Sequence, residues 1–310
     1  MDFRNREKRY RTLSETYKER FGRKVFKVPI DGGFTCPNKD GSKGSGGCIY
    51  CSPSGSGDFT AEASLSVRDQ FFTLKRRMEE KWPDALTMPY FQANTNTYAP
   101  VSTLRPMFEA ALDLDESVVG IAIATRCDCL PDAVLDLLEA LNKKKPVQLE
   151  LGLQSIHART AEWINRGHDL ACFDAAVRAL KKRGLEVVVH IINGLPGESD
   201  ADMLKTVDHL NALQIDGIKI HMLHVMEHTA LGHRYKKAPF HLLSLEEYVA
   251  ITTRQIERLD PDVVIHRLSG DAPRDTLIAP EWTLKKFVVM NEIDKALRRR
   301  DTYQGYAFKR

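Results

Sequence analysis

A glycine-rich loop near the start of the chain reads Cys36-Pro37-Asn38, eight further residues, and then Gly47-Cys48-Ile49-Tyr50-Cys51. Three cysteines so close together indicate thiolate ligands of a metal. A tetrahedral zinc site needs a fourth ligand, and the loop holds no further Cys or His to supply it. An iron–sulfur cluster with one open iron fits this ligand set better. Zinc completed from another part of the chain, or a loop with incidental cysteines, stays an alternative.

Length and composition favour one large domain, or one domain with an appendage. The chain has 310 residues and a formal net charge of +3, which permits a nucleic-acid substrate without arguing for one. No N-terminal segment resembles a signal peptide, and no apolar run approaches the roughly 20 residues of a membrane span. We therefore expect a cytoplasmic protein without membrane contact, in which the six cysteines are metal ligands or core residues.

Short apolar runs alternate with amphipathic stretches, which is typical of repeated βα units and a parallel sheet. The runs predict strands at residues 24–29, 86–92, 118–125, 147–152, 185–192 and 217–222. Apolar residues recur at helical spacing between them, as at 132–141, 173–182 and 201–213. The pattern predicts an α/β fold, a partial (β/α)6 TIM-like barrel. Chemistry in such barrels lies at the C-terminal strand ends, and the cysteine loop follows the first predicted strand.

The cysteine loop resembles the cluster loop of the radical S-adenosylmethionine (radical SAM) superfamily, in which the residue before the last cysteine is usually aromatic, as Tyr50 is. The spacing differs, because eleven residues separate Cys36 from Cys48, whereas the superfamily's commonest spacing is three. The resemblance implies a barrel of the radical SAM type, a [4Fe–4S] cluster on Cys36, Cys48 and Cys51, and S-adenosylmethionine (SAM) bound at the open iron.

Two later loops contain residues similar to SAM contacts of the superfamily. Gln154 and Asn165-Arg166-Gly167-His168 resemble the Elongator catalytic subunit, and coproporphyrinogen oxidase has a similar Gln and Arg. This implies that Gln154 hydrogen-bonds the ribose and that Arg166 pairs with the methionine carboxylate. Asn94 and Thr95 stand where the superfamily receives the SAM amino group, and they offer oxygen acceptors for it. A surface arginine and a polar helix-capping turn are the alternatives.

The fifth predicted strand leads into Asn193-Gly194, which is similar to the segment that packs on the adenine. His190 in that strand is interpreted either as a ribose contact or as a core histidine. The resemblance places other polar residues above the cluster, facing the substrate, and these are Arg126, Asp128, His221 and His224. None of them is assigned a catalytic role.

The remaining segments resemble the YhcC/YtqA-type group of the superfamily, notably residues 217–225, 266–274, 277–280 and 300–305. Cys127 departs from that group, which typically has proline there. With Cys129 it forms a Cys-x-Cys pair that we interpret as packing, with an extra metal or redox role as the alternative. Cys172 is expected in the core. We predict a core of residues 1–235, including an N-terminal extension. A small, mainly helical C-terminal extension, 236–310, is expected to close the barrel, with helices at 245–259 and 284–299.

The resemblance implies an enzyme that cleaves SAM reductively to a 5′-deoxyadenosyl radical, with a reductase, flavodoxin or ferredoxin as electron donor. The Elongator catalytic subunit modifies the wobble uridine of transfer RNA, so a tRNA substrate is one hypothesis. Basic runs at 143–145, 181–183 and 298–300 are compatible with phosphate contacts, or are solvated helix ends. A coproporphyrinogen oxidase-like enzyme acting on a small molecule and a non-enzymatic zinc-binding module are the alternatives.

Overall fold

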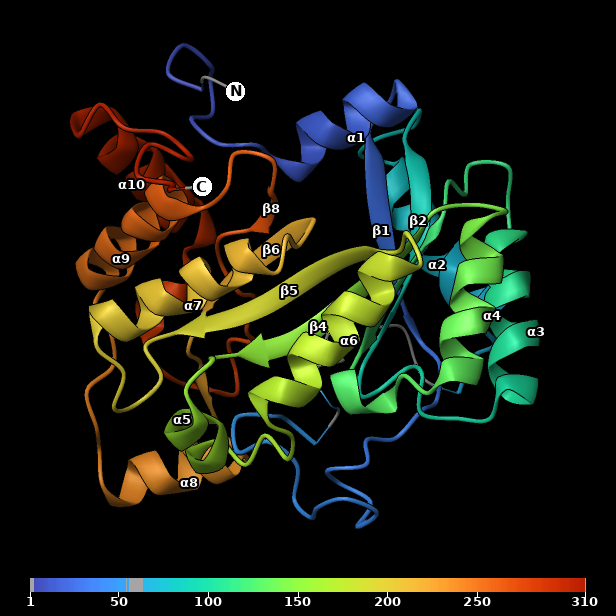
Figure 1. The fold of residues 1–310 in the computed structure, drawn as a ribbon, viewed down its shortest axis with the longest axis horizontal. Helices are drawn as coiled ribbons and strands as arrows, with labels where there is room; N and C mark the ends of the chain where they lie inside the picture. Colours follow the sequence, from blue (N-terminus) through green and yellow to red (C-terminus); the bar gives the residue numbers. More distant parts are fainter. Residues whose placement is uncertain (1–2, 54, 56–63, 310) are drawn as a thin grey trace.

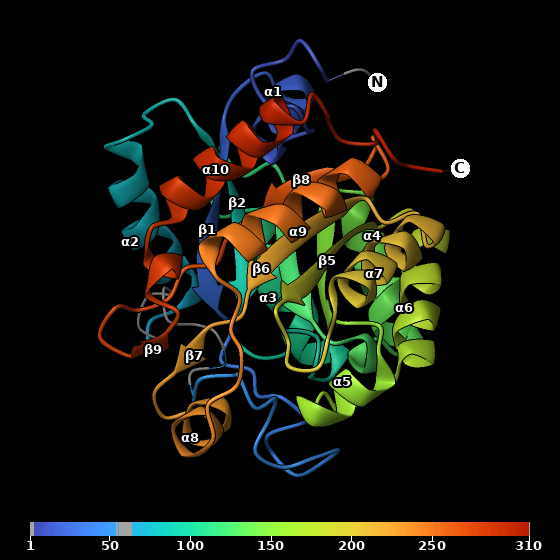
Figure 2. The same cartoon turned by 90° about the vertical axis from the view of Figure 1, so that its left-hand side faces the viewer.

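The computed structural model describes residues 3–53, 55 and 64–309, and its centre is a seven-stranded parallel sheet that curls into a partial barrel (Figures 1 and 2). The order of the strands across the sheet is the order of the sequence. They are β1 (Val25–Asp31), β2 (Leu86–Gln92), β3 (Ile121–Thr125), β4 (Val147–Gln154), β5 (Glu186–Asn193), β6 (Gly217–Met222) and β8 (Val264–Arg267). The predicted α/β partial barrel is confirmed, and each of the six predicted strands is present. The seventh, β8, was not predicted.

Helices cover the outer face of the sheet and extend beyond its ends (Figure 1). Those in the first half of the chain are α1 (Leu13–Phe21), α2 (Val67–Glu79), α3 (Val101–Leu112), η1 (Cys127–Cys129) and α4 (Asp132–Asn142). Next come α5 (Ala158–Trp163), α6 (Leu170–Lys182), α7 (Asp200–Ala212), α8 (Ala230–Lys237), α9 (Leu245–Arg258), η2 (Glu281–Leu284) and α10 (Lys286–Arg299). The strands β7 (Val225–Met226) and β9 (Leu277–Ala279) form a separate antiparallel pair. The division of the chain after residue 235 stays a prediction, and α8 runs across it.

The two faces of the sheet differ because side chains alternate along each strand. Phe26, Val28 and Ile30 of β1 belong to the main apolar core beneath the helices. The strands β4, β5 and β6 contribute to the same core Leu149, Leu151, Val187, Val189, Ile218 and Ile220. The residues between them point to the concave face and include Lys27, Glu150, His190 and Lys219. The barrel interior is therefore polar although its wall is built from apolar strands.

The two ends of the chain meet at the end of the barrel where the strands begin (Figure 2). Gln304 is fully buried, and its side-chain oxygen accepts a 2.8 Å hydrogen bond from the backbone N–H of Arg11. Its amide nitrogen donates to the carbonyl oxygens of Asp260 and Val263, just before β8. The cysteine loop lies at the opposite end. Within the described residues, no helix has both the length and the apolar character that crossing a membrane requires.

Candidate functional site

The cysteine loop folds back on itself directly after β1. The carbonyl oxygen of Cys36 accepts hydrogen bonds from the backbone N–H groups of Lys39 and Asp40, at 2.8 and 3.1 Å. The N–H of Cys51 donates to the carbonyl oxygen of Cys48 at 2.9 Å, which closes a tight turn between these two cysteines. Cys48 is buried, whereas Cys36 and Cys51 are half-buried. The loop is thus a folded unit whose three thiols have different exposures.

A second segment, residues 164–167 after α5, is joined to the cysteine loop by hydrogen bonds. The side-chain amide of Asn165 donates to the carbonyl oxygen of Gly47 at 2.8 Å, and the side chain of Asn38 donates to the carbonyl oxygen of Asn165 at 2.6 Å. The N–H of Ile49 donates to the carbonyl oxygen of Ile164 at 3.0 Å. Gly167 has φ +74°, and a Cβ there would lie 2.5 Å from Asn38 Oδ1. These contacts bring together the cysteine loop, predicted to bind the cluster, and the segment of Arg166, predicted to bind SAM.

Arg166 reaches from this segment to the sulfur of Cys48. Its Nη1 lies 3.6 Å from Cys48 Sγ, and Asn38 Nδ2 lies 3.8 Å from the same sulfur. Its Nη2 donates to the carbonyl oxygen of Gly152, while its Nε is buried without a partner among the described atoms. Burial opposes the charge, but the adjacent Cys48 raises the pKa of Arg166 above its ordinary value. A permanently charged donor therefore faces one predicted cluster ligand.

Gly152 and Gln154 form the wall beside this arginine. The register between β4 and β5 shifts between these two residues, and Gln154 has φ +72°. A Cβ on Gly152 would lie 2.9 Å from Gln154 Nε2 and 3.0 Å from Arg166 Nη2. The two side chains predicted to contact SAM therefore converge at a point where glycine leaves room for them.

The loop after β2 supports the cysteine loop. Asn94 donates to the carbonyl oxygen of Phe34 at 3.0 Å and accepts from Lys39 Nζ at 3.4 Å. The N–H of Thr95 donates to the carbonyl oxygen of Thr35 at 3.2 Å, whereas its buried hydroxyl has no partner among the described atoms. Asn94 thus holds the cysteine loop through hydrogen bonds. The loop after β2 also carries the Thr95 hydroxyl, which has no hydrogen-bond partner among the described atoms.

His190 lies on the concave face within a buried network around Glu150. Glu150 accepts hydrogen bonds from Tyr90 Oη and His190 Nε2, both at 2.7 Å, and from Lys27 and Lys219 Nζ, both at 2.5 Å. The donors come from β2, β5, β1 and β6. Despite burial, the two lysines hold the pKa of Glu150 well below its ordinary value. This network was not predicted from the sequence, where its only signal is the presence of charged residues inside otherwise apolar strands.

The same environment acts on the other members of this network. Burial, and then the positive charge of Lys219, lower the pKa of His190 to about 4. Burial lowers the pKa of Lys219 to about 8, although Glu150 opposes that shift. The centroids of the His190 and His221 rings are 5.4 Å apart. The Nε2 atoms of His221 and His224 are buried without partners among the described atoms. The interior thus holds neutral imidazoles next to one saturated carboxylate.

Other predicted positions make contacts with supporting elements. The side chain of Asn193 exchanges hydrogen bonds with Gln255 of α9 at 2.8 and 2.9 Å, and Gly194 (φ +85°) lies against Leu243. Tyr50 packs half-buried against the small apolar cluster around Ile49. The structure therefore places Asn193 against α9 and Gly194 against the segment that precedes α9.

Residues of the loop after β3 support Arg166 indirectly. Arg126 is buried, donates to the carbonyl oxygen of Arg166 at 2.9 Å, and pairs with Asp128 at 2.9 Å. Cys127 is buried with its sulfur 3.6 Å from that of Cys172. Burial raises the pKa of both Cys127 and Cys129, to about 12 for Cys129, so these thiols stay protonated at neutral pH. This agrees with our interpretation of Cys127 as a packing residue.

The three loop cysteines fit an iron–sulfur cluster. Within residues 3–53, 55 and 64–309, no three His, Cys, Asp or Glu side chains gather tightly enough to hold a single metal ion. Cysteine thiolates are the usual ligands of iron–sulfur clusters, and three of them leave one iron of a [4Fe–4S] cluster open. The unpartnered Arg166 Nε and Thr95 hydroxyl also leave hydrogen-bonding capacity for a polar ligand. The donor set and its surroundings suit a cluster with a polar molecule beside it.

Comparison with known proteins gives the family. Residues 41–210 match the Radical SAM superfamily, and residues 215–299 match the Radical_SAM C-terminal domain. The chain belongs to the radical SAM superfamily. Protein YtqA of Bacillus subtilis is 47% identical over 306 residues, which cover 99% of this chain and 95% of YtqA. The predicted superfamily, group and barrel type are confirmed, and the superfamily's cofactors are the predicted [4Fe–4S] cluster and SAM.

The Elongator resemblance is more distant. Elongator complex protein 3 of Homo sapiens is 26% identical over 191 residues, which are 59% of this chain and 34% of that protein. The structure of archaeal Methanocaldococcus infernus Elp3 with an N-terminal deletion superposes with a TM-score of 0.66 at 19% identity, covering 90% of this chain and 64% of that one. The latter likeness shows that the fold is shared.

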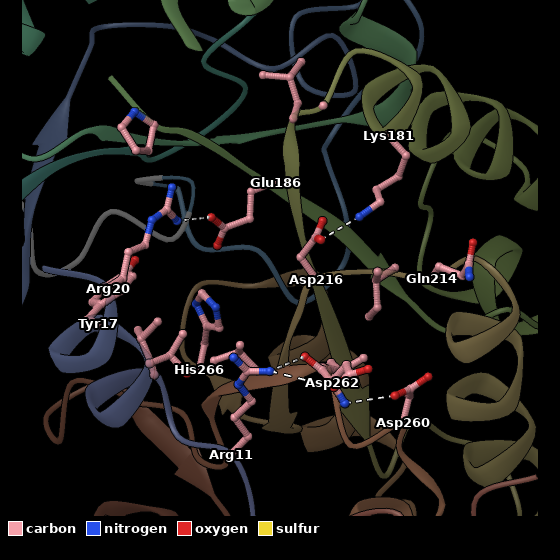
Figure 3. A pocket seen from close by; sticks show the side chains of 18 of the residues that line it. Arg11, Tyr17, Arg20, Lys181, Glu186, Gln214, Asp216, Asp260, Asp262 and His266 are labelled. Carbon is pink, nitrogen blue, oxygen red and sulfur yellow. Dashed lines mark hydrogen bonds and ion pairs between the residues drawn. The ribbon is translucent and has the colours of Figure 1, made fainter. Parts of the chain in front are cut away.

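A cavity of about 640 Å³ opens at the other end of the sheet, where β5, β6 and β8 begin (Figure 3). Several of its charged groups pair with one another. Arg20 contacts Glu186 at 3.1 Å, and Lys181 contacts Asp216 at 2.5 Å. Barrel chemistry belongs at the strand C-termini, where the cysteine loop lies, so this cavity is not assigned to the radical SAM site.

Replacing His190 by Gln is expected to reduce the pH dependence of stability. The folded-state pKa of about 4 lies below the unfolded value near 6.5, so the unfolded chain takes up this proton first as pH falls. The wild type should therefore lose about 2 kcal/mol more unfolding free energy than His190→Gln between pH 7 and pH 5. Urea unfolding at both pH values measures this. The exposed control His233→Gln should retain the wild-type slope, and equal slopes for all three proteins would contradict the prediction.

Replacing Arg166 by Leu is expected to make the reduction potential of the cluster more negative. Hydrogen bonds to cluster sulfurs stabilise the reduced form, and this variant removes the donor that lies 3.6 Å from Cys48 Sγ. A redox titration followed by electron paramagnetic resonance (EPR) measures the potential. Arg159→Leu, at an exposed α5 arginine paired with Asp202, is the matched control. An unchanged potential in an Arg166→Leu protein with full iron and sulfide would count against this contact.

Proposed function

We propose that this chain cleaves SAM on a [4Fe–4S] cluster held by Cys36, Cys48 and Cys51, and uses the radical to modify transfer RNA. The main support is the set of hydrogen bonds between the cysteine loop and the Asn165-to-Gly167 segment. It joins the predicted cluster ligands to Arg166, the predicted SAM contact, in one rigid arrangement. Cys36, Cys48 and Cys51 would hold the cluster, which would supply the one electron needed to cleave bound SAM reductively.

The chain's own residues prepare this site for SAM. Arg166 keeps Nε available for the methionine carboxylate while its two other nitrogens bind Cys48 and Gly152. In this proposal Gln154 contacts the ribose, and the Thr95 hydroxyl accepts from the SAM amino group. Asn94 and Tyr50 shape the cysteine loop. Asn193 and Gly194, at the end of β5, support the adenine of SAM, and α9 holds the side chain of Asn193.

The concave face provides the walls of the substrate cavity. Glu150 is saturated by Lys27, Tyr90, His190 and Lys219, so it has no further role as a base. A radical needs a site from which water and stray donors are excluded. His221 and His224, whose Nε2 atoms lack partners among the described atoms, are the groups that we propose to face the substrate.

The support for RNA is the similarity to Elongator complex protein 3, since the basic runs support it less than the sequence suggested. These runs stand at the C-terminal ends of α4, α6 and α10, where cations complement the helix dipole. Five of their nine residues pair with carboxylates, namely Lys143, Lys144, Lys181, Arg183 and Arg300. Lys181 also lines the cavity at the strand starts, away from the cysteine loop.

Anaerobic reconstitution with iron and sulfide, followed by dithionite and SAM, tests the radical chemistry. We expect 5′-deoxyadenosine, measured by mass spectrometry, from the wild type and none from Cys48→Ala, because that variant removes the buried ligand. Cys172→Ala, which changes a half-buried thiol outside the loop, should retain both cluster and product. Zinc without sulfide in the anaerobically purified wild type would refute the cluster assignment and favour the metal-stabilised binding module.

Association of the cluster-loaded protein with bulk tRNA tests the substrate class. If RNA is bound through its phosphates, the logarithm of the binding constant should fall linearly with the logarithm of salt concentration. Fluorescence anisotropy over a range of salt concentrations measures this slope. A protein that forms 5′-deoxyadenosine but shows no salt-sensitive tRNA binding would instead favour a small-molecule substrate.

A further inference from the structure

Helix α8 packs directly on the loop that carries Cys48 and Cys51. The backbone N–H of Leu231, in the first turn of α8, donates to the carbonyl oxygen of Ile49 at 2.8 Å. The side chains of Leu231 and Ile49 share a small apolar cluster. Gly232 lets α8 lie close to β7, because a Cβ at this position would lie 2.2 Å from the carbonyl oxygen of Met226. A molecule bound to the outer surface of α8 is therefore held beside the predicted cluster ligands.

The outer surface of α8 carries a group of cations, Arg234, Lys236 and Lys237, which we call the α8 patch. Arg234 and Lys237 are exposed and three residues apart, so they lie on the same side of the helix. Lys236 pairs with Glu227 at 2.6 Å, but neither Arg234 nor Lys237 pairs with a carboxylate within the described part of the chain. The Arg234 guanidinium lies 5.6 Å from the centre of the Trp163 ring, which restricts its position.

The α8 patch lies at the same end of the molecule as the cysteine loop, opposite α1 and the two chain termini (Figures 1 and 2). From Leu231 to Lys237 the helix rises about 9 Å. Lys237 therefore lies within about 9 Å, along the helix axis, of the residue that contacts the loop. Exposed positive charge thus lies on the helix whose first turn contacts the loop of Cys48 and Cys51.

We propose that the α8 patch is the docking surface for a small acidic electron-transfer protein of the flavodoxin or ferredoxin class. The inference rests on the proposed function, because the site needs a donor only if it holds a cluster. Electron transfer becomes rapidly slower with distance, so the donor must bind close to the ligand loop. Electron-transfer complexes are weak, use small interfaces, and depend on charge to orient the partners.

The size of the patch favours an acidic protein over RNA. Binding of RNA through its backbone neutralises several phosphates at once, and the patch offers two cations without carboxylate partners. Two unpaired cations over an apolar base suit a transient, charge-steered protein contact. In the encounter, the fully reduced flavin of the donor loses one electron and the oxidised cluster gains it, with no bond made or broken.

The double variant Arg234→Glu/Lys237→Glu tests this surface in the cluster-loaded protein. Its matched control is Lys182→Glu/Arg299→Glu, which reverses one exposed lysine and one exposed arginine at the ends of α6 and α10. Reduction of the cluster by prereduced flavodoxin is followed anaerobically by stopped-flow absorbance and by EPR of the reduced cluster. We expect about tenfold slower reduction of the α8 variant at low salt, a difference that closes at high salt, and wild-type behaviour of the control.

Dithionite provides the reference, because a small reductant needs no docking surface and should reduce all three proteins equally. Equal slowing of both double variants by flavodoxin would overturn the proposal, since the effect would then follow net charge alone. An α8 variant that reacts normally with flavodoxin but loses salt-sensitive tRNA binding would assign the surface to RNA instead. Failure of the wild type itself to assemble a cluster would refute the proposed function, and this inference with it.

Discussion

The carboxylate of Glu150 is the group on which the shape of the barrel depends. A charge fully removed from water is tolerated only when donors surround it, and Glu150 has four, from β1, β2, β5 and β6. A flat sheet would hold β1 and β6 far apart, since four strands, β2 to β5, lie between them. Their lysines meet on one side chain because the sheet curls. The polar interior and the curvature therefore require each other.

This constraint separates the molecule into two ends with different character. At the strand starts, the chain termini meet, and ion pairs such as Lys181 with Asp216 join charged residues that line the cavity. At the strand ends, hydrogen bonds run between loops, from Asn38 to Asn165 and from Asn165 back to Gly47. Several unpartnered buried donors and acceptors lie at this second end or on the concave face next to it, including Arg166 Nε and the Thr95 hydroxyl. The cysteine loop thus lies beside polar groups that can bind a ligand.

The sequence was most informative where the signal is local. Apolar runs located six strands, but β8 has only four residues, one of them an exposed arginine, and it was missed. The network of Glu150 could not be predicted, because it joins residues from Lys27 to Lys219 whose proximity depends on the closed sheet. Asn193 shows the same limit. Its side chain was associated with a nucleoside by resemblance, yet Gln255, distant in sequence, takes both ends of its amide.

Arg166 shows how a resemblance and a structure inform each other. The family pattern implies a partner for this guanidinium on SAM, whereas the structure gives it the Cys48 sulfur and the Gly152 carbonyl. These roles are compatible, because a guanidinium has five N–H donors in a rigid plane, and of its three nitrogens only Nε lacks a partner among the described atoms. A lysine could not serve both, since its donors converge on one nitrogen. Arg166 thus connects a predicted cluster ligand to the predicted place of SAM, and the orientation of its plane fixes both contacts together.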